Sequence, residues 1–236
     1  MKRKFSNIVS LGSFCSVAME LEKKGLRGAS YPFDWLISDS FECVISEIEN
    51  GFGDFLNLEF LKREHRPDVC GNTKTRMHFY HDFNVSSSIE EQIPALQEKY
   101  SRRIQRFYSD IKQPTLFVRY CIFPEDEQYV MQNRQKIIQI LQSFNPANRI
   151  LYVMSTDKSN SLTKQDDGWI ALMKQPQNDY IKNWIDTVPG LSGLLYSVSS
   201  YSAFRILKNI FICYKKKIQR KLHRCAEGRG RRNIRT

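Results

Sequence analysis

The sequence predicts an α/β fold in which a mostly parallel sheet is flanked by helices in three layers, with a basic helix at the C-terminus. Segments 7–12, 115–123 and 149–156 are short apolar runs of the kind that parallel sheets bury on both faces. Segments with helical periodicity separate them. Strand and helix therefore alternate along the chain, which is the pattern of a parallel sheet with helical connections.

The first elements are a strand, a turn and a helix. The strand at 7–12 stops at Gly12, and the helix at 14–24 carries an apolar face and has Gly25 as its C-cap. A second helix is expected at 40–50, after Ser and Asp residues that can cap it.

The middle of the chain continues the alternation. Residues 76–83 are expected to be a strand because aromatic residues alternate there, and 88–111 a long amphipathic helix with two acids in its first turn. A further helix is expected at 126–143. Residues 157–168 are polar and predict a loop, and 169–200 give weak signals for both strand and helix.

The charge is concentrated at the C-terminus. Residues 201–236 contain 12 Lys and Arg and one acid, whereas the preceding 200 residues contain 24 basic and 24 acidic side chains. A composition that is 41% hydrophobic supports one well-buried core in a chain of this size. We therefore expect an α/β domain at 1–200, followed at 201–236 by a basic amphipathic helix and a tail disordered from residue 226.

The sequence favours a cytoplasmic protein. No run of about 18 apolar residues could span a bilayer, and the apolar stretch after the basic N-terminus is too short for a signal peptide. Six cysteines occur without zinc-site spacing, so thiols are expected rather than disulfides. Neither a metal nor an organic cofactor is predicted.

The apolar residues of the C-terminal segment recur every three or four positions, which places them on one stripe of a helix. A helix of this kind can pack its stripe on the body, or lie on an anionic membrane surface and make the protein membrane-peripheral. Nucleic acid is disfavoured as a partner, because no recognised DNA- or RNA-binding module accompanies the charge. The stripe consists of Phe204, Leu207, Phe211, Tyr214, Ile218 and Leu222.

Cys15 is the candidate nucleophile, because it follows a glycine-containing turn and opens the helix at 14–24. A helix N-terminus favours the thiolate, and its N–H groups can hold an oxyanion. The turn Gly12-Ser13-Phe14 would line the substrate-binding site. The alternative interpretation is that Cys15 is a small buried apolar residue.

The candidate bases are His78 and His81, two of the four histidines in the chain. Because they are three positions apart on a strand, they point to opposite faces, and only one can reach a shared site directly. We favour His81 as the base because it lies at the strand end beside Asp82, and place His78 among the substrate-binding residues. Alternatively, both are partly exposed polar residues of an edge strand.

Two further charged residues lie in apolar surroundings. Asp34 stands between two aromatic residues, and burying it would be costly without a partner such as His81 or Arg119. In such a pair it could orient the histidine, and otherwise it is a capping or turn residue. Arg119 lies inside an apolar strand and is expected to bind Asp34, Asp82 or an anionic substrate.

Two motifs resemble a known family. The run SLGSFCSVAMELEKKGLRGASYPFDWLIS at 10–38 and HFYHDF at 78–83 are similar to an uncharacterised bacterial family described as papain-like cysteine peptidases (DUF1796). The similarity extends to FVRY at 117–120. It implies a cysteine nucleophile, carried here by Cys15, and a histidine from the HFYHDF motif. It also suggests a link with surface polysaccharide.

The leading hypothesis is a cysteine-dependent hydrolase or acyl transferase. Cys15 would attack the carbonyl of an acyl, peptide or glycan substrate, with His81 as base and Asp34 or Asp82 to orient it.

Two alternatives remain open. One is an enzyme of cell-surface polysaccharide biosynthesis that modifies glycans or binds a sugar nucleotide, with phosphate at the Gly12 turn and an anion on Arg119. The other is a non-enzymatic module that acts at membranes through residues 201–236.

Overall fold

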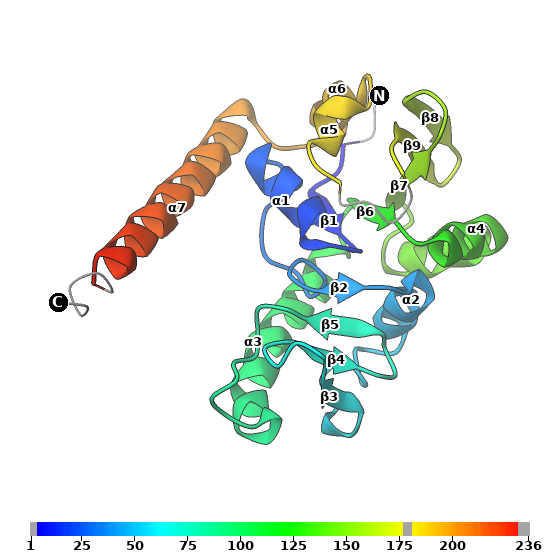
Figure 1. Ribbon diagram of the computed structural model, residues 1–236. Helices are drawn as coiled ribbons and strands as arrows, with labels where there is room; N and C mark the ends of the chain where they lie inside the picture. The colour runs from blue at the N-terminus through cyan, green and yellow to red at the C-terminus, as the bar shows by residue number, and fades with distance from the viewer. Residues whose placement is uncertain (1–3, 177–180, 231–236) are drawn as a thin grey trace.

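The computed structural model of the protein describes residues 4–176 and 181–230, with side chains as far as residue 219 (Figure 1). Its central sheet contains β1 (Asn7–Ser10), β6 (Thr115–Cys121), β7 (Arg149–Thr156), β8 (Ser161–Gln165) and β9 (Gly168–Lys174). The strand order is β1-β6-β7-β9-β8. The first four strands of this order run parallel, and only β8 is antiparallel to its neighbour. The mostly parallel sheet predicted from the sequence is therefore confirmed.

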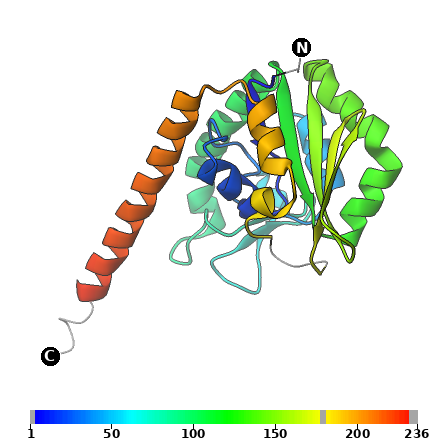
Figure 2. The same ribbon diagram turned by 90° about the horizontal axis from the view of Figure 1, so that it is seen from above.

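Helices cover both faces of this sheet (Figure 2). One face packs on α1 (Cys15–Lys23), α5 (Trp184–Thr187) and α6 (Leu191–Val198), and the other on α2 (Phe41–Glu49) and α4 (Pro124–Phe144). Alternate residues of β6 enter the two cores, Val118 and Tyr120 on the α1 side and Phe117 and Cys121 on the α4 side. Every residue of β6 is buried as a result, which explains why its sequence is mainly apolar.

The segment predicted to be a polar loop, 157–168, contains β8. This strand forms a hairpin with β9, from Ser161 opposite Leu172 to Gln165 opposite Gly168. An edge strand leaves much of its surface to solvent, and none of the residues of β8 is fully buried. Its polar composition therefore gives no strand signal, although its backbone is paired.

A second, antiparallel sheet lies beside the edge strand β1 (Figure 1). Its order is β2-β5-β4-β3, and the long helix α3 (Ile89–Asp110) packs against it within the same core as α2 and α4. The strand predicted at 76–83 is only three residues long, and the other three strands have no counterpart among the predictions. Strands of two or three residues are too short to show periodicity. They are β2 (Ile37–Ser38), β3 (Leu61–Arg63), which follows the 3-10 turn η1 (Leu58–Phe60), β4 (Cys70–Asn72) and β5 (Met77–Phe79).

The helix α1 ends at the expected glycine, although Gly25 is the residue after the C-cap and not the C-cap itself. Lys24 is the C-cap, and Gly25 follows with φ +70°. The Gly25 amide donates to the Glu22 carbonyl at 3.0 Å, and the Leu26 amide donates to the Leu21 carbonyl at 2.9 Å. This is the Schellman arrangement, in which a left-handed residue satisfies the last carbonyl groups of a helix.

The C-terminal helix α7 (Ala203–Gly230) stands out from the body (Figures 1 and 2). It extends to Gly230, so the disorder expected from residue 226 does not begin there, and residues 231–236 lie outside the described residues. The apolar stripe of α7 does not pack on the body: Phe204, Phe211 and Tyr214 are 78%, 70% and 66% exposed. Among the described residues, no helix is long and apolar enough to cross a membrane.

Candidate active site

The turn that carries Cys15 continues the edge of the parallel sheet. The Leu11 amide donates to the Val118 carbonyl at 2.8 Å, and the Tyr120 amide donates to the Gly12 carbonyl at 3.0 Å. Cys15 is then the first residue of α1, and it is partly exposed. The structure therefore has the strand, turn and helix that the sequence predicts around this cysteine, at the carboxyl end of the parallel strands. Ligands of open α/β sheets bind at that end.

Gly12 is required by the path of this turn. Its φ is +80°, and an added Cβ would lie 2.9 Å from the Ser38 hydroxyl oxygen and 3.3 Å from Nη1 of Arg119. A side chain would meet both the strain of a left-handed backbone and a tight contact. The turn thus allows close approach between β1 and the second sheet.

Hydrogen bonds join the turn to the second sheet. The Ser38 amide donates to the Ser13 carbonyl at 2.9 Å, and the Ser13 hydroxyl donates to the Ser38 carbonyl at 3.0 Å. Both residues are buried. The residue after Ser38, Asp39, therefore lies close to the turn that leads into Cys15.

Arg119 braces this junction. The side chain is fully buried, and it forms an ion pair with Asp126 at 2.5 Å. It also donates to the Leu11 carbonyl at 3.0 Å and to the hydroxyl and carbonyl oxygens of Ser38 at 2.6 and 3.0 Å. The expected pairing with Asp34 or Asp82 is wrong, because the carboxylate that binds Arg119 is that of Asp126, in the first turn of α4. A guanidinium enclosed in this way is not presented to an anionic substrate.

Asp34 has a different partner from those expected. Arg27 donates to its Oδ2 at 3.1 and 2.6 Å, and the Tyr31 amide donates to the same oxygen at 2.8 Å. Burial raises the pKa of the Asp34 carboxyl, and Arg27 opposes that shift. The pairing with His81 or Arg119 is therefore wrong, because a cation seven residues upstream satisfies the carboxylate locally.

His81 and Asp82 lie beyond the end of β5. His81 is exposed, whereas the Asp82 side chain is 1% exposed and binds Lys99 and the Tyr100 hydroxyl, the latter at 2.7 Å. Asp82 therefore anchors the turn after β5 to α3. Its acceptor oxygens are directed to that helix and not to the histidine.

His78 is half-buried between two carboxylates. Its Nε2 lies 2.7 Å from Asp39 and its Nδ1 contacts Glu64. The Asp39 carboxylate makes the largest contribution, and together with Glu64 it raises the pKa of His78 to about 9. Burial of the ring lowers the pKa, but by less. His78 is thus an imidazolium at neutral pH. Because Asp39 adjoins Ser38, His78 is the histidine that the structure connects to the Cys15 turn.

A further polar cluster lies at the carboxyl ends of β6, β7 and β9, and the sequence analysis did not include it. The hydroxyl oxygens of Tyr120 and Ser155 are 3.4 Å apart, and the amide nitrogen of Gln175 contacts both. Tyr120 belongs to the core on the α1 side of the sheet, the side on which Cys15 opens its helix. The sequence signal that could have identified this cluster is the presence of polar residues at the carboxyl ends of buried strands.

Within the part of the chain that the structure describes, no group of three or more His, Cys, Asp or Glu side chains is placed to hold a metal ion. A pocket of about 580 Å³ lies between residues 51–58 and α3, and no candidate residue lines it.

A known protein family matches the part of the chain that contains the candidate site. The model of a family described as "putative papain-like cysteine peptidase (DUF1796)" matches residues 6–154, which include Cys15, His78 and Arg119. The chain belongs to this family.

One curated relative of this DUF1796 chain is the uncharacterised protein R408 of Acanthamoeba polyphaga mimivirus. It is 27% identical over 202 residues, which cover 75% of this chain and 87% of the relative. A bacterial origin has no support from this match to a viral protein. No solved structure matches the chain significantly.

Proposed function

We propose that this DUF1796 protein is a cysteine-dependent hydrolase or acyl transferase with Cys15 as its nucleophile. The observation that carries the proposal is the position of Cys15, partly exposed as the first residue of α1 at the carboxyl end of the sheet. The N-terminal dipole of a helix stabilises a thiolate there. Family membership supports peptidase-type chemistry at the level of the family.

The proposed reaction has two steps. The thiolate of Cys15 attacks a carbonyl carbon, and first-turn N–H groups of α1 stabilise the negative charge that develops on the oxygen. Collapse of this intermediate expels the alcohol or amine, which takes a proton, and leaves a thioester on Cys15. Water releases the acid in a hydrolase, and an acceptor alcohol or amine takes the acyl group in a transferase.

His78 is the better-supported proton carrier. The Ser13–Ser38 hydrogen bonds connect its carboxylate partner Asp39 to the Cys15 turn, whereas His81 is exposed beyond the strand. Asp39 and Glu64 keep His78 protonated, which suits a general acid or a cation beside a thiolate. To pass a proton to the leaving alcohol or amine, one imidazole N–H must leave its carboxylate partner.

The structure weakens the alternative that the protein modifies glycans or binds a sugar nucleotide, because one of the residues expected to bind the ligand is not accessible. Arg119, its expected anion-binding residue, is enclosed by Asp126, Ser38 and the Leu11 carbonyl. Thermal shift with a panel of nucleotide sugars tests this alternative directly, because a ligand of the Gly12 turn would raise the melting temperature.

The decisive experiment traps the thioester. The full chain is incubated with p-nitrophenyl acetate, and acetylated peptides are mapped by mass spectrometry. Cys43 is a matched control, because it is also partly exposed in the first turn of a helix. We expect Cys15→Ala to abolish the burst of nitrophenol and Cys43→Ala to leave it unchanged. Equal acetylation of Cys15 and Cys43, or a burst that survives Cys15→Ala, would contradict the proposal.

A further inference from the structure

The helix α7 exposes large apolar side chains in a row. The described members of this row, which we call the α7 stripe, are Phe204, Leu207, Phe211, Tyr214 and Ile218, and each is at least half exposed. Scattered apolar residues are normal on protein surfaces, but a contiguous row of aromatic and aliphatic side chains marks an interaction site.

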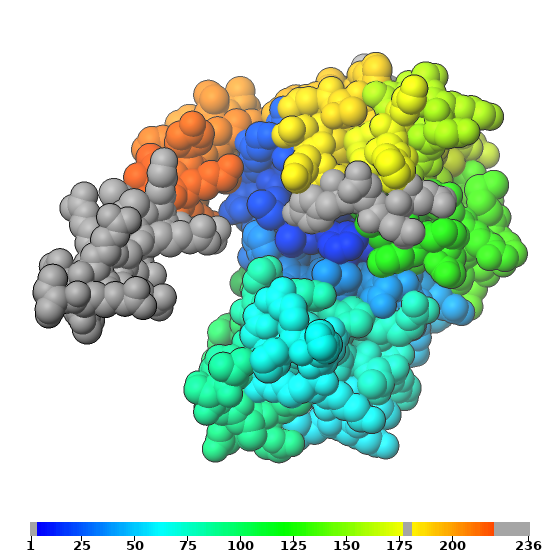
Figure 3. Space-filling model, viewed as in Figure 1, coloured from blue at the N-terminus to red at the C-terminus, as the bar shows by residue number. Residues whose placement is uncertain are grey.

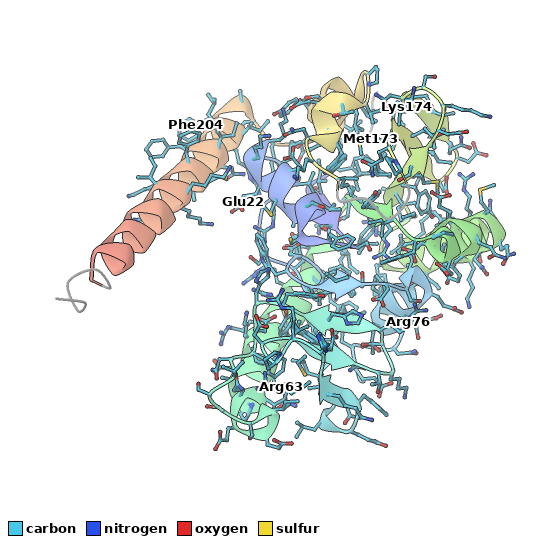
Figure 4. All side chains as sticks on the ribbon, viewed as in Figure 1. Glu22, Arg63, Arg76, Met173, Lys174 and Phe204 are labelled. Carbon is cyan, nitrogen blue, oxygen red and sulfur yellow. The ribbon has the colours of Figure 1, made fainter. Side chains whose placement is uncertain are left out.

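The body holds α7 through a different face of the helix. The Asn209 side chain donates to the Gly25 carbonyl at 3.0 Å, and Lys216 forms an ion pair with Glu22 at 3.2 Å. Gly25 lies against the helix so closely that a Cβ would be 2.5 Å from the Ile206 carbonyl oxygen. Glu22 lies on the side of α1 that faces α7, and Phe204 points away from the body (Figure 4). The body therefore contacts another face of α7, and the α7 stripe is left exposed while the helix is docked.

Exposed lysines border the α7 stripe. By the 3.6-residue period of the helix, Lys208 and Lys215 lie on one side of the stripe and Lys217 on the other. No Asp or Glu occurs between residues 203 and 219, and the C-terminal 36 residues carry the entire excess of positive charge. An apolar row between cations is the arrangement of helices that lie in the interface of an anionic membrane.

We propose that α7 binds the surface of membranes that contain anionic phospholipid, with the α7 stripe inserted among the acyl chains and Lys208, Lys215 and Lys217 at the phosphates. The described turns of α7 stand out from the body, so a flat surface can reach them (Figure 3). Anionic lipid is concentrated in the cytoplasmic leaflet, which fits the cytoplasmic location that the sequence predicts.

Charge argues against a second copy of the chain as the occupant. Two α7 helices packed stripe to stripe would bring their bordering lysines together, and no Asp or Glu between residues 203 and 219 could pair with them. In helical dimers, opposite charges beside the apolar seam favour pairing and like charges oppose it. An anionic surface supplies the charge that a second α7 lacks.

Vesicle co-sedimentation of the full chain tests the proposal. We expect binding to phosphatidylcholine vesicles that contain phosphatidylserine, little binding to phosphatidylcholine alone, and loss of binding as salt increases. The double variants Phe204→Ser with Phe211→Ser, and Lys208→Gln with Lys215→Gln, should each weaken binding about tenfold. Met131→Ser and Lys158→Gln change exposed residues of the body and serve as matched controls.

Three results would overturn the proposal. One is equal binding to both kinds of vesicle, and another is unchanged binding by the two double variants. The third is a wild-type dimer in light scattering that becomes monomeric in the Phe204→Ser, Phe211→Ser variant while vesicle binding is absent, since a second copy would then cover the stripe. Circular dichroism of each variant shows whether α7 is retained.

Discussion

The hydroxyl of Ser13 donates to the main-chain carbonyl of Ser38 at 3.0 Å, and the amide of Ser38 donates back to the carbonyl of Ser13 at 2.9 Å. This reciprocal pair joins the turn before Cys15 to the second sheet. The candidate nucleophile Cys15 opens the helix that follows β1 of the parallel sheet, and the proposed proton carrier His78 belongs to β5 of the antiparallel sheet. The proposed approach of these two residues therefore depends on the Ser13–Ser38 hydrogen bonds and on Arg119, which binds both Ser38 and the Leu11 carbonyl.

Removing the Ser13 hydroxyl tests that junction. Ser13→Ala leaves the buried Ser38 carbonyl without this donor, and we expect a loss of about 1–2 kcal/mol in the free energy of unfolding, with slower acylation of Cys15. Ser16→Ala is the control, because that buried hydroxyl has no hydrogen-bond partner among the described residues. Urea denaturation should show little change for Ser16→Ala. Equal losses in both variants would mean that the Ser13 bond has no special role.

A side chain at Gly12 should disturb the same junction. Gly12→Ala combines a φ of +80° with a Cβ only 2.9 Å from the Ser38 oxygen, and we expect it to cost about 2–3 kcal/mol. Gly51→Ala isolates the backbone term, because Gly51 has a φ of +74° and open space around its Cβ position. It should cost about 1 kcal/mol. The free energy of unfolding of both variants is measured by thermal unfolding. Equal losses of stability in Gly12→Ala and Gly51→Ala would rule out the steric contact.

Breaking the buried ion pair should be the most destabilising change. Arg119→Met leaves the carboxylate of Asp126 buried without its cation, which costs about 3–5 kcal/mol. The double variant Arg119→Met with Asp126→Leu should recover much of this loss, because it removes both charges from the interior. Arg66→Gln is the control, since the Arg66–Asp68 pair is exposed and such pairs contribute less than about 1 kcal/mol. A double variant no more stable than Arg119→Met would contradict this expectation.

The His78 cluster should make stability depend on pH. The folded-state pKa of His78 is about 9, above the value of about 6.5 expected in the unfolded chain. Its contribution, on the order of 3 kcal/mol, is therefore complete below pH 6.5 and is lost as the pH rises through 9. The difference in unfolding free energy between wild type and His78→Gln should follow that curve. His81→Gln changes an exposed histidine and serves as the control. A difference for His78→Gln that does not change with pH would refute the ion-pair assignment.

Local patterns in the sequence determined a large part of this structure. The apolar runs at 115–123 and 149–156 were typical of buried strands, and Gly12 and Gly25 marked the two ends of the Cys15 helix. These features depend on residues within a few positions of one another, so they can be recognised without knowledge of the fold.

The tertiary structure alone decided which groups meet. Asp34 and Arg119 were each expected to be paired, but their partners are Arg27 and Asp126, each seven residues away in the sequence, which no periodic pattern identified. The three- and two-residue strands of the second sheet are held by pairing with their neighbours and not by their own periodicity. The α7 stripe looked like a core face, and it is exposed because α7 docks through Asn209 and Lys216 on another side. A sequence fixes which side of a helix is apolar, but the packing of the remaining elements determines whether anything covers it.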